Sequence, residues 1–349
     1  MNIAPQRRSI FAGCVLALCI VGPFGELRAG SWAYGASDST HTVQPAQTFS
    51  QVDALGLPPA AASQLKHALE AHDSIAAEKL LLAEINRDPH STHAGQLLQF
   101  LGGVYFLEHD PWHAAIAWNK AKAIAPLPPT VSFSLAMAYV RIGHPNWARK
   151  VIVSLAANDA SNALYPYWLG RLDYDAQHYD DAILKFQKAI QLAPNMAQAY
   201  NNLGLCYYRQ RQNRLATVNF EKAIDLNSKS GHADAWPYLN LAVTERALNQ
   251  RSEAEAHLRE AIRLEPSLAV AHFQLGNVLE DAGRTDGAIN EFETAARLDA
   301  SYAEPHFALA RIYRKLGKSA DSKREVETYV RLHSQSQTQP ARLPATSHP

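Results

Sequence analysis

The sequence has few cysteines, and their positions leave little scope for disulfides. Only three occur in 349 residues, and two of them, Cys14 and Cys19, fall within the first twenty positions. If that segment is removed from the mature chain, Cys206 is left alone and no intramolecular disulfide can form. We therefore expect the stability of the fold to come from packing.

The chain also lacks an excess of charge of either sign. Lys plus Arg number 33, Asp plus Glu number 33, and the formal net charge is zero. This balance gives no overall attraction to nucleic acid or to anionic membranes, so we expect neither as a partner of the mature chain. Hydrophobic residues make up 47% and charged residues 19%, so most of the chain is able to fold.

Motifs that carry catalysis or bind cofactors are missing. There is no His-Glu-x-x-His, no glycine-rich phosphate loop, no Cys-x-x-Cys and no Gly-x-Ser-x-Gly. Among the histidines, the pair His90 and His93 and the pair His109 and His113 fall near different predicted loops, too far apart to share one metal. We expect no enzyme activity, no cofactor and no metal site.

The N-terminus has the layout of an export signal. Arg7 and Arg8 precede an uncharged stretch, residues 9–25, whose apolar part is Ile10–Val21. Because small residues just before position 34 fit a cleavage site, residues 1–33 are predicted to be a cleavable secretory signal peptide. The uncharged stretch is shorter than the roughly 20 residues of a membrane span. An uncleaved anchor in the inner membrane is the alternative.

A cleaved signal peptide and an uncleaved anchor both predict the same location for the rest of the chain. Positive charges stay on the cytoplasmic side, so the folded part is expected outside the cytoplasm, either periplasmic or secreted. In the alternative it is tethered to the inner membrane and still lies outside. Arg7 and Arg8 also fit part of a twin-arginine export signal, which leaves the export route open.

Two segments lack the apolar periodicity of folded elements. Residues 34–57 are rich in Ser, Thr, Gln, Ala, Gly and Pro and are predicted to be a flexible linker. Residues 337–349 have the same character and are predicted to be a disordered tail.

Residues 58–336 carry an internal repeat. Seven leucines are spaced by 34 residues, apart from one interval of 38, at positions 101, 135, 169, 203, 241, 275 and 309. The residue after each leucine is Gly or Ala. An alanine follows thirteen residues after the leucine in all but the last repeat, and a large apolar side chain comes four residues later. We place the four extra residues of the long interval in a loop near residues 230–234.

This pattern resembles the tetratricopeptide repeat family, whose signature is Trp-x-x-Leu-Gly-x-x-Tyr, then Ala-x-x-x-Phe, then Pro, on a 34-residue period. The best repeat, residues 197–230, has Leu203, Gly204, Tyr207, Ala216 and Phe220 in register. The resemblance implies an all-α fold, an α-solenoid of about eight helix pairs coiled into a right-handed superhelix. The eight repeats begin near Pro58, Gly95, Pro129, Ala163, Ala197, Ala235, Ala269 and Ala303.

The pattern also has a physical reason. In each repeat, the small residue after the leucine and the later alanine lie where two helices cross closely. A larger side chain there would force the helices apart, at a cost of about 1–3 kcal/mol. A single helix pair leaves an apolar face exposed, so the repeats must stack.

The resemblance further implies that the first helix of each repeat lines a concave groove, with positions 2, 5, 9 and 12 facing it. Aromatic side chains are frequent there and are candidate peptide-binding residues, because they supply contact area at low entropic cost. They are Phe133, Tyr167, Tyr174, Tyr208, Trp236, Phe273 and Phe307. The alternative is that tight coiling buries these rings against neighbouring helices.

Amide side chains at position 6 of three consecutive repeats are a second set of candidates. Asn202, Asn240 and Gln274 match an arrangement in which some members of the family grip the backbone of an extended peptide. An amide can donate to C=O and accept from N–H, so it suits sequence-tolerant binding. In that case the amides should face solvent in the free protein. The alternative is that they pin helices together.

These observations predict a protein-interaction scaffold that binds partner protein or peptide segments in its groove, outside the cytoplasm. One alternative is a structural subunit of a cell-envelope assembly, such as pilus, secretion or outer-membrane machinery. A second is an enzyme with a site built on the solenoid, since a fold never excludes one. The sequence does not indicate the identity of the partner or the oligomeric state.

Overall fold

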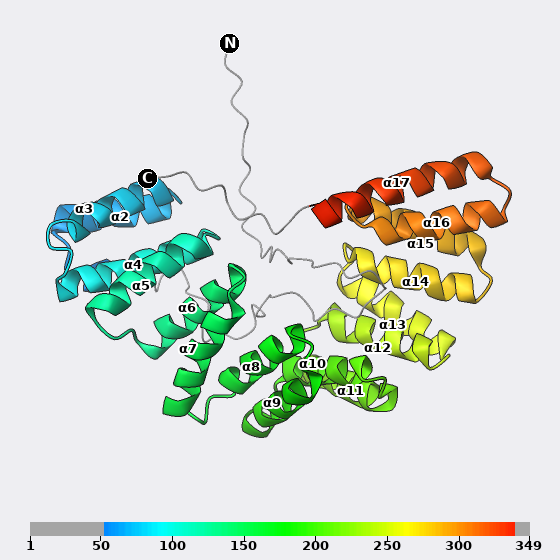
Figure 1. Cartoon of the computed structure of the whole chain (residues 1–349), viewed down its shortest axis with the longest axis horizontal. Coiled ribbons are helices and arrows are strands. Elements are labelled where there is room, and N and C mark those ends of the chain that lie inside the picture. Colours follow the sequence, from blue (N-terminus) through cyan, green and yellow to red (C-terminus); the bar gives the residue numbers. More distant parts are fainter. Residues whose placement is uncertain (1–51, 339–349) are drawn as a thin grey trace, which may run out of the picture. The chain divides into compact units, whose positions relative to one another are not determined.

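The computed structural model describes residues 52–338. The signal peptide predicted for residues 1–33, most of the predicted linker and most of the predicted tail therefore lie outside the described residues. Within residues 52–338 the chain forms eight hairpins of two helices each, numbered here as repeats 1 to 8 (Figure 1). The helices group into two compact units, residues 52–193 and residues 194–338.

The N-terminal unit, residues 52–193, holds repeats 1 to 4. Their first helices are α2 (Pro59–Glu70), α4 (Thr92–Leu107), α6 (Pro129–Arg141) and α8 (Leu164–Asp175). Their second helices are α3 (Ser74–Ile85), α5 (Pro111–Ile124), α7 (Pro145–Asn158) and α9 (Tyr179–Leu192).

The C-terminal unit, residues 194–338, holds repeats 5 to 8. Their first helices are α10 (Ala197–Arg209), α12 (Ala235–Ala247), α14 (Ala269–Asp281) and α16 (Ala303–Lys315). Their second helices are α11 (Asn213–Ser230), α13 (Arg251–Leu264), α15 (Thr285–Leu298) and α17 (Ser319–Thr338).

Within each unit the repeats stack in chain order. The second helix of one repeat packs on the first helix of the next, as α3 does on α4 and α13 does on α14. The predicted all-α solenoid of eight helix pairs is confirmed, whereas the right-handed coil stays a prediction. None of the described helices is both long enough and apolar enough to span a membrane.

The repeat signature marks the core of each hairpin. Leu203 and Phe220 are 5% and 0% exposed. A β-carbon added to Gly204 would lie 2.6 Å from Cε1 of Phe220, closer than carbon atoms can approach. The small residue after the leucine is therefore required by the aromatic ring of the second helix, as predicted.

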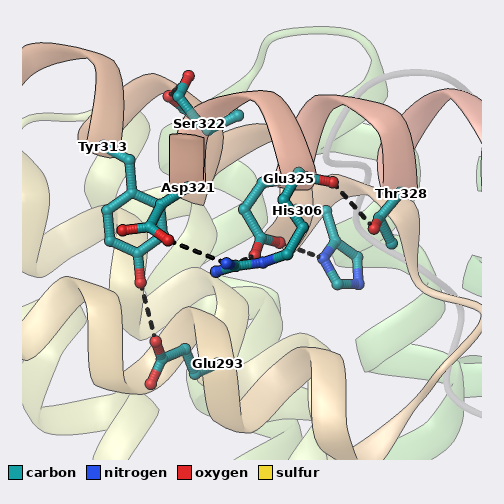
Figure 2. A network of polar contacts seen from close by, with 9 residues as sticks. Glu293, His306, Tyr313, Asp321, Ser322, Glu325 and Thr328 are labelled. Atoms are coloured by element: carbon teal, nitrogen blue, oxygen red, sulfur yellow. Dashed lines mark hydrogen bonds and ion pairs between the residues drawn. The ribbon is translucent and has the colours of Figure 1, made fainter. Parts of the chain in front are cut away.

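Tyrosines of the signature fasten one repeat to the next. The hydroxyl of Tyr139 donates to Oδ1 of Asn119 at 2.8 Å, and that of Tyr313 donates to Oε1 of Glu293 at 3.0 Å. Figure 2 shows the second contact between α15 and α16. Burial and this hydrogen bond raise the pKa of Tyr313 to about 12, so its hydroxyl stays protonated and continues to donate at physiological pH.

The predicted linker is wrong for its last six residues, 52–57. Val52 and Leu55 are 0% and 8% exposed and belong to the core of repeat 1. They lie three residues apart in one helical turn, so both side chains reach the same face. Lys66 on α2 also pairs with Asp53 at 2.6 Å. The predicted tail, 337–349, begins inside α17, which ends at Thr338.

The four extra residues of repeat 5 lie in a helix rather than in the predicted loop. Helix α11 has 18 residues, whereas α13 has 14. No proline interrupts Leu226–Ser230, so the helix continues for one more turn. It ends at Ser230 and is capped by Gly231, which adopts the left-handed conformation with a φ of 71°.

Candidate functional site

The three predicted amides lie in the interior of the C-terminal unit. Asn202 on α10, Asn240 on α12 and Gln274 on α14 are 3%, 0% and 3% exposed. The expectation that these amides face solvent in the free chain is therefore wrong. Position 6 of the first helix places them where the first helices of neighbouring repeats meet, since α10 contacts α12 and α12 contacts α14.

Asn240 pins repeat 6 to repeat 5. Its Nδ2 donates to Oδ1 of Asn201 at 3.0 Å, and both side chains are buried. Nδ2 of Asn202 donates to the backbone oxygen of Gln198, at 2.9 Å within α10. For Asn240 the geometry fits the alternative of a structural pin, and a peptide-binding role for the three amides stays a prediction.

In the N-terminal unit, the predicted aromatic residues pack against other rings. Tyr167 and Tyr174 are each 8% exposed. The ring of Tyr167 lies 5.9 Å from that of Phe186, and the ring of Tyr174 lies 5.5 Å from that of Tyr179. Phe133 is half-buried, 6.0 Å from the ring of Tyr165. For Tyr167 and Tyr174 the alternative of burial holds.

In the C-terminal unit, the aromatic residues divide into buried and accessible ones. Phe273 is 8% exposed, between the rings of Phe292 and Tyr302 at 5.6 Å and 5.3 Å. Phe307 is 54% exposed. Tyr208 and Trp236 are half-buried. The structure thus leaves three predicted rings of this unit open to a partner.

Tyr208 borders a cavity on the first helices of repeats 5 to 7. The cavity has a volume of about 340 Å³, and four helices (α10, α12, α13 and α14) and one turn contribute to it. Its lining includes Tyr208, Val243, Arg246, Asn249, Arg251 and Asp281.

The charged groups around this cavity are partly paired. Nε of Arg246 donates to Oδ2 of Asp281 at 2.7 Å and links α12 to α14. Arg251 forms no ion pair with any residue in the described range. Two guanidinium groups and one carboxylate give the lining a surplus of positive charge. Such a site suits a carboxylate, which arginine binds through two parallel hydrogen bonds.

The same kind of pairing continues along the first helices. Glu280 on α14 accepts from Arg311 on α16, and Lys315 on α16 lies 3.4 Å from the same carboxylate. Charged side chains at the end of the first helices therefore link repeats 6, 7 and 8.

Family models of repeat sequences match the middle of the chain. Two described as tetratricopeptide repeat match residues 195–265 and 239–304, and one described as TPR repeat matches residues 170–210. The chain is a tetratricopeptide repeat protein.

Solved structures share this fold. A tetratricopeptide repeat protein from Parabacteroides merdae is 17% identical, with a TM-score of 0.57, and the match covers 72% of this chain and 94% of that one. Pseudomonas aeruginosa pilF is 20% identical, with a TM-score of 0.53, covering 65% and 99%. PilW, described as a type IV pilus biogenesis factor, is 21% identical, with a TM-score of 0.53, covering 60% and 94%. The comparison with curated protein sequences found no match.

Histidine–glutamate pairs fasten the two helices within three tetratricopeptide repeats. Nδ1 of His272 lies 2.7 Å from Oε2 of Glu291, and the pair His306 and Glu325 has the same distance (Figure 2). In repeat 6 the order is reversed, with Glu245 on α12 and His257 on α13 at 2.8 Å. The hydrogen bonds to Glu291 and Glu245 raise the pKa values of His272 and His257, against an opposing effect of burial.

The charged residues of the cavity are not among the residues predicted from the sequence. Arg246 and Asp281 come at positions 12 and 13 of adjacent tetratricopeptide repeats, with opposite charge. Opposite charges at these positions in successive repeats are the signal that could have identified the pair. Within residues 52–338, no group of three or more His, Cys, Asp or Glu side chains is arranged to hold a metal ion.

Proposed function

We propose that this tetratricopeptide repeat protein is a scaffold that binds a segment of a partner protein across the first helices of repeats 5 to 7. The observation that supports this proposal is the cavity of about 340 Å³ beside Tyr208. It combines an aromatic wall with Arg246 and Arg251, the side-chain types that most often anchor protein interfaces. We propose no catalytic role for the chain.

The proposal includes a location outside the cytoplasm. The support is the pattern of residues 1–33, with two arginines before an apolar run. A fusion of residues 1–57 to a reporter that is active only outside the cytoplasm tests it. We expect an active reporter. A fusion that is present and soluble in the cytoplasm, with an inactive reporter, would contradict export.

The scaffold function is tested by capture of partners from envelope extract. The wild-type chain is compared with Tyr208→Ala/Arg246→Ala, which removes the aromatic wall and one guanidinium. Because the Arg246–Asp281 pair is exposed, its loss should cost no more than about 1 kcal/mol of stability. We expect partners that bind the wild type and are lost from the variant.

The control for this capture experiment is Arg331→Ala, which removes an exposed arginine from α17. It should capture the same partners as the wild type. If the double variant captures them equally well, the cavity is not the binding site.

A structural subunit of a cell-envelope assembly is the second candidate. It is favoured by exposed apolar side chains on the second helices of the N-terminal unit: Ile75, Leu184, Val153, Trp147 and Trp112 are between 77% and 40% exposed. Large apolar side chains in contact with water often mark protein interfaces. The fold is also shared with PilW, which is described as a pilus biogenesis factor. Purification under native conditions separates the two, since a stable stoichiometric complex favours the subunit.

A further inference from the structure

The turn between the two helices of repeat 5 goes against a backbone preference. Each of the eight turns has one residue in the left-handed conformation, which is a glycine in repeats 3, 7 and 8 and a non-glycine residue in the other five. Repeat 5 places Arg211 there, with a φ of 61°. A β-carbon is strained in this conformation, which is why glycine is the ordinary choice. An arginine at this point is unfavourable for the turn itself.

The next helical turns break an electrostatic preference. Arg214 is the second residue of α11, and Arg251 is the first residue of α13. The N-terminal end of a helix favours acidic side chains and disfavours basic ones. Helices α15 and α17 follow that rule with Asp286 and Asp321. Repeats 5 and 6 therefore carry arginines where local helix physics disfavours them.

These three arginines lack ion-pair partners within residues 52–338, although Glu253 lies in the first turn of α13 and Asp281 lines the cavity beside Arg251. Arg211, Arg214 and Arg251 are exposed, and none forms an ion pair with another residue of the described range. Side chains that break local rules without a stabilising contact occur mainly at functional sites. The three charges are therefore better explained by a partner than by the fold.

A second cavity lies beside these arginines. It also has a volume of about 340 Å³, and its lining includes Arg211, Arg214, Leu215 and Leu248. Leu215 and Leu248 are 46% and 38% exposed, so they form an accessible apolar floor. We name the surface made of Arg211, Arg214, Leu215, Leu248 and Arg251 the arginine edge.

The arginine edge adjoins the first cavity. Leu248 lines one cavity and its neighbour Asn249 lines the other, so both border the turn of repeat 6. Asp281 is the only acidic residue that lines either one. The edge is thus a continuous surface with a large surplus of guanidinium groups around two leucines.

We propose that the arginine edge binds an acidic peptide segment that places an apolar side chain between Leu215 and Leu248. This inference rests on the proposed scaffold function and gives the partner its chemistry. Guanidinium groups bind carboxylates through paired hydrogen bonds, and exposed leucines offer apolar contact. A polyphosphate chain or a nucleic acid backbone would satisfy the arginines but would leave the leucines exposed.

The test uses the full chain and a short fluorescein-labelled peptide that alternates acidic residues with leucine. Arg214→Glu/Arg251→Glu should lower the affinity by at least roughly tenfold, because it turns two attractions into repulsions. The variant should melt no earlier than the wild type, because acidic residues suit these helix ends. Arg211→Gly should also bind more weakly and melt later.

A matched control keeps the same change of net charge. Lys229→Glu/Arg297→Glu reverses two basic side chains in the last turns of α11 and α15. For α11 this lies a helix length away from the arginine edge, about 25 Å. The control should bind the peptide within about twofold of the wild type, since exposed charges at that distance are screened by salt.

Four results would overturn the proposal. The first is equal affinity of the charge-reversal variant and the wild type. The second is equal affinity for a peptide in which serine replaces leucine, which would leave the leucines without a role. The third is tighter binding of a short single-stranded DNA than of the peptide. The fourth is a wild-type oligomer that the reversal dissociates, since a second copy would then cover the edge.

The outcomes also separate this inference from the proposed function. If partners are captured from extract through the Tyr208 cavity but the acidic peptide does not bind, the inference fails and the scaffold function stands. If the peptide binds at the arginine edge but Tyr208→Ala/Arg246→Ala captures all partners normally, the Tyr208 cavity is not the partner site. Peptide binding at the arginine edge is then supported on its own.

Discussion

Repeats 2 and 6 have the same backbone at the turn between their helices but opposite chemistry. Both place a non-glycine residue in the left-handed conformation, His109 in one and Asn249 in the other. The next residue caps the second helix. In repeat 2 it is Asp110, whose carboxylate accepts from the backbone nitrogen of His113 at 3.0 Å. In repeat 6 it is Gln250, which makes no such bond, and Arg251 follows it.

The difference between the two repeats separates residues that the fold requires from residues that we propose to bind a partner. Helix physics explains the acidic residue of repeat 2, because a carboxylate satisfies a free N–H at the helix start. The same physics argues against the arginines of repeats 5 and 6. Since the core positions are the same in both repeats, the turns are free to differ. Residues that helix physics does not explain are the ones to test for binding.

The largest effect should come from the core that all the repeats share. Leu203→Ala removes a side chain that is 5% exposed and should cost about 2–5 kcal/mol of unfolding free energy in urea denaturation. Leu215→Ala, on the arginine edge, should change it by less than about 0.5 kcal/mol. Similar losses in the two variants would contradict the separation of core from edge.

A smaller effect is expected from the amide pin between repeats 5 and 6. Asn240→Ala leaves the buried Oδ1 of Asn201 without its donor, so it should cost about 1–3 kcal/mol. Thermal melting measures this directly. If the variant has the melting temperature of the wild type but no longer captures a partner, Asn240 contacts the ligand. The predicted peptide-binding role of the amides at position 6 would then be supported.

The core leucine and the buried amide show why part of the fold and of the site could be predicted from the sequence and part could not. The register of Leu203, Gly204 and Phe220 could be predicted, because each side chain fills a place that the crossing of two helices dictates. The burial of Asn240 could not, since its partner, Asn201, lies in the preceding repeat and an asparagine can pair or face water equally well. Arg246 and Asp281 are likewise 35 residues apart, so only stacked repeats bring them together.

The predictions for the last six residues of the linker and for the loop after repeat 5 are both wrong because a local feature outweighs a regional pattern. The linker was predicted from the average of residues 34–57, and that average conceals the single helical turn that buries Val52 and Leu55. The sequence predicts a loop for the extra residues of repeat 5, because they fall between two signatures. Continuation of α11 depends on the lack of a proline there, which is a local feature.

A reciprocal exchange of caps sharpens the comparison of repeats 2 and 6. Asp110→Gln should destabilise by about 1 kcal/mol, because it removes the cap of α5. Gln250→Asp should stabilise by a similar amount, because it supplies the cap that α13 lacks. Urea denaturation of both single variants and of the double variant measures this. If Gln250→Asp gives no gain, the turn of repeat 6 is constrained in a way that the comparison does not capture.

The smallest effect concerns pH and the C-terminal unit. The hydrogen bond to Glu291 raises the folded-state pKa of His272 above the unfolded value of about 6.5. Protonation therefore favours the folded chain, and this contribution is fully present below about pH 6.5. It is lost as the pH rises through the raised pKa of the folded state. The pKa of His257 is raised in the same way by its hydrogen bond to Glu245.

Urea denaturation at a series of pH values tests this contribution. His272→Gln and Glu291→Gln should each lower the free energy of unfolding by at most about 1 kcal/mol at acidic pH. Each should also make the free energy of unfolding less dependent on pH above the acidic range. Because both variants break one contact, their combination should cost less than the sum of the two. Additive losses would mean that the two side chains act separately. A pH dependence that is the same as in the wild type would mean that His272 does not stay paired with Glu291 in solution.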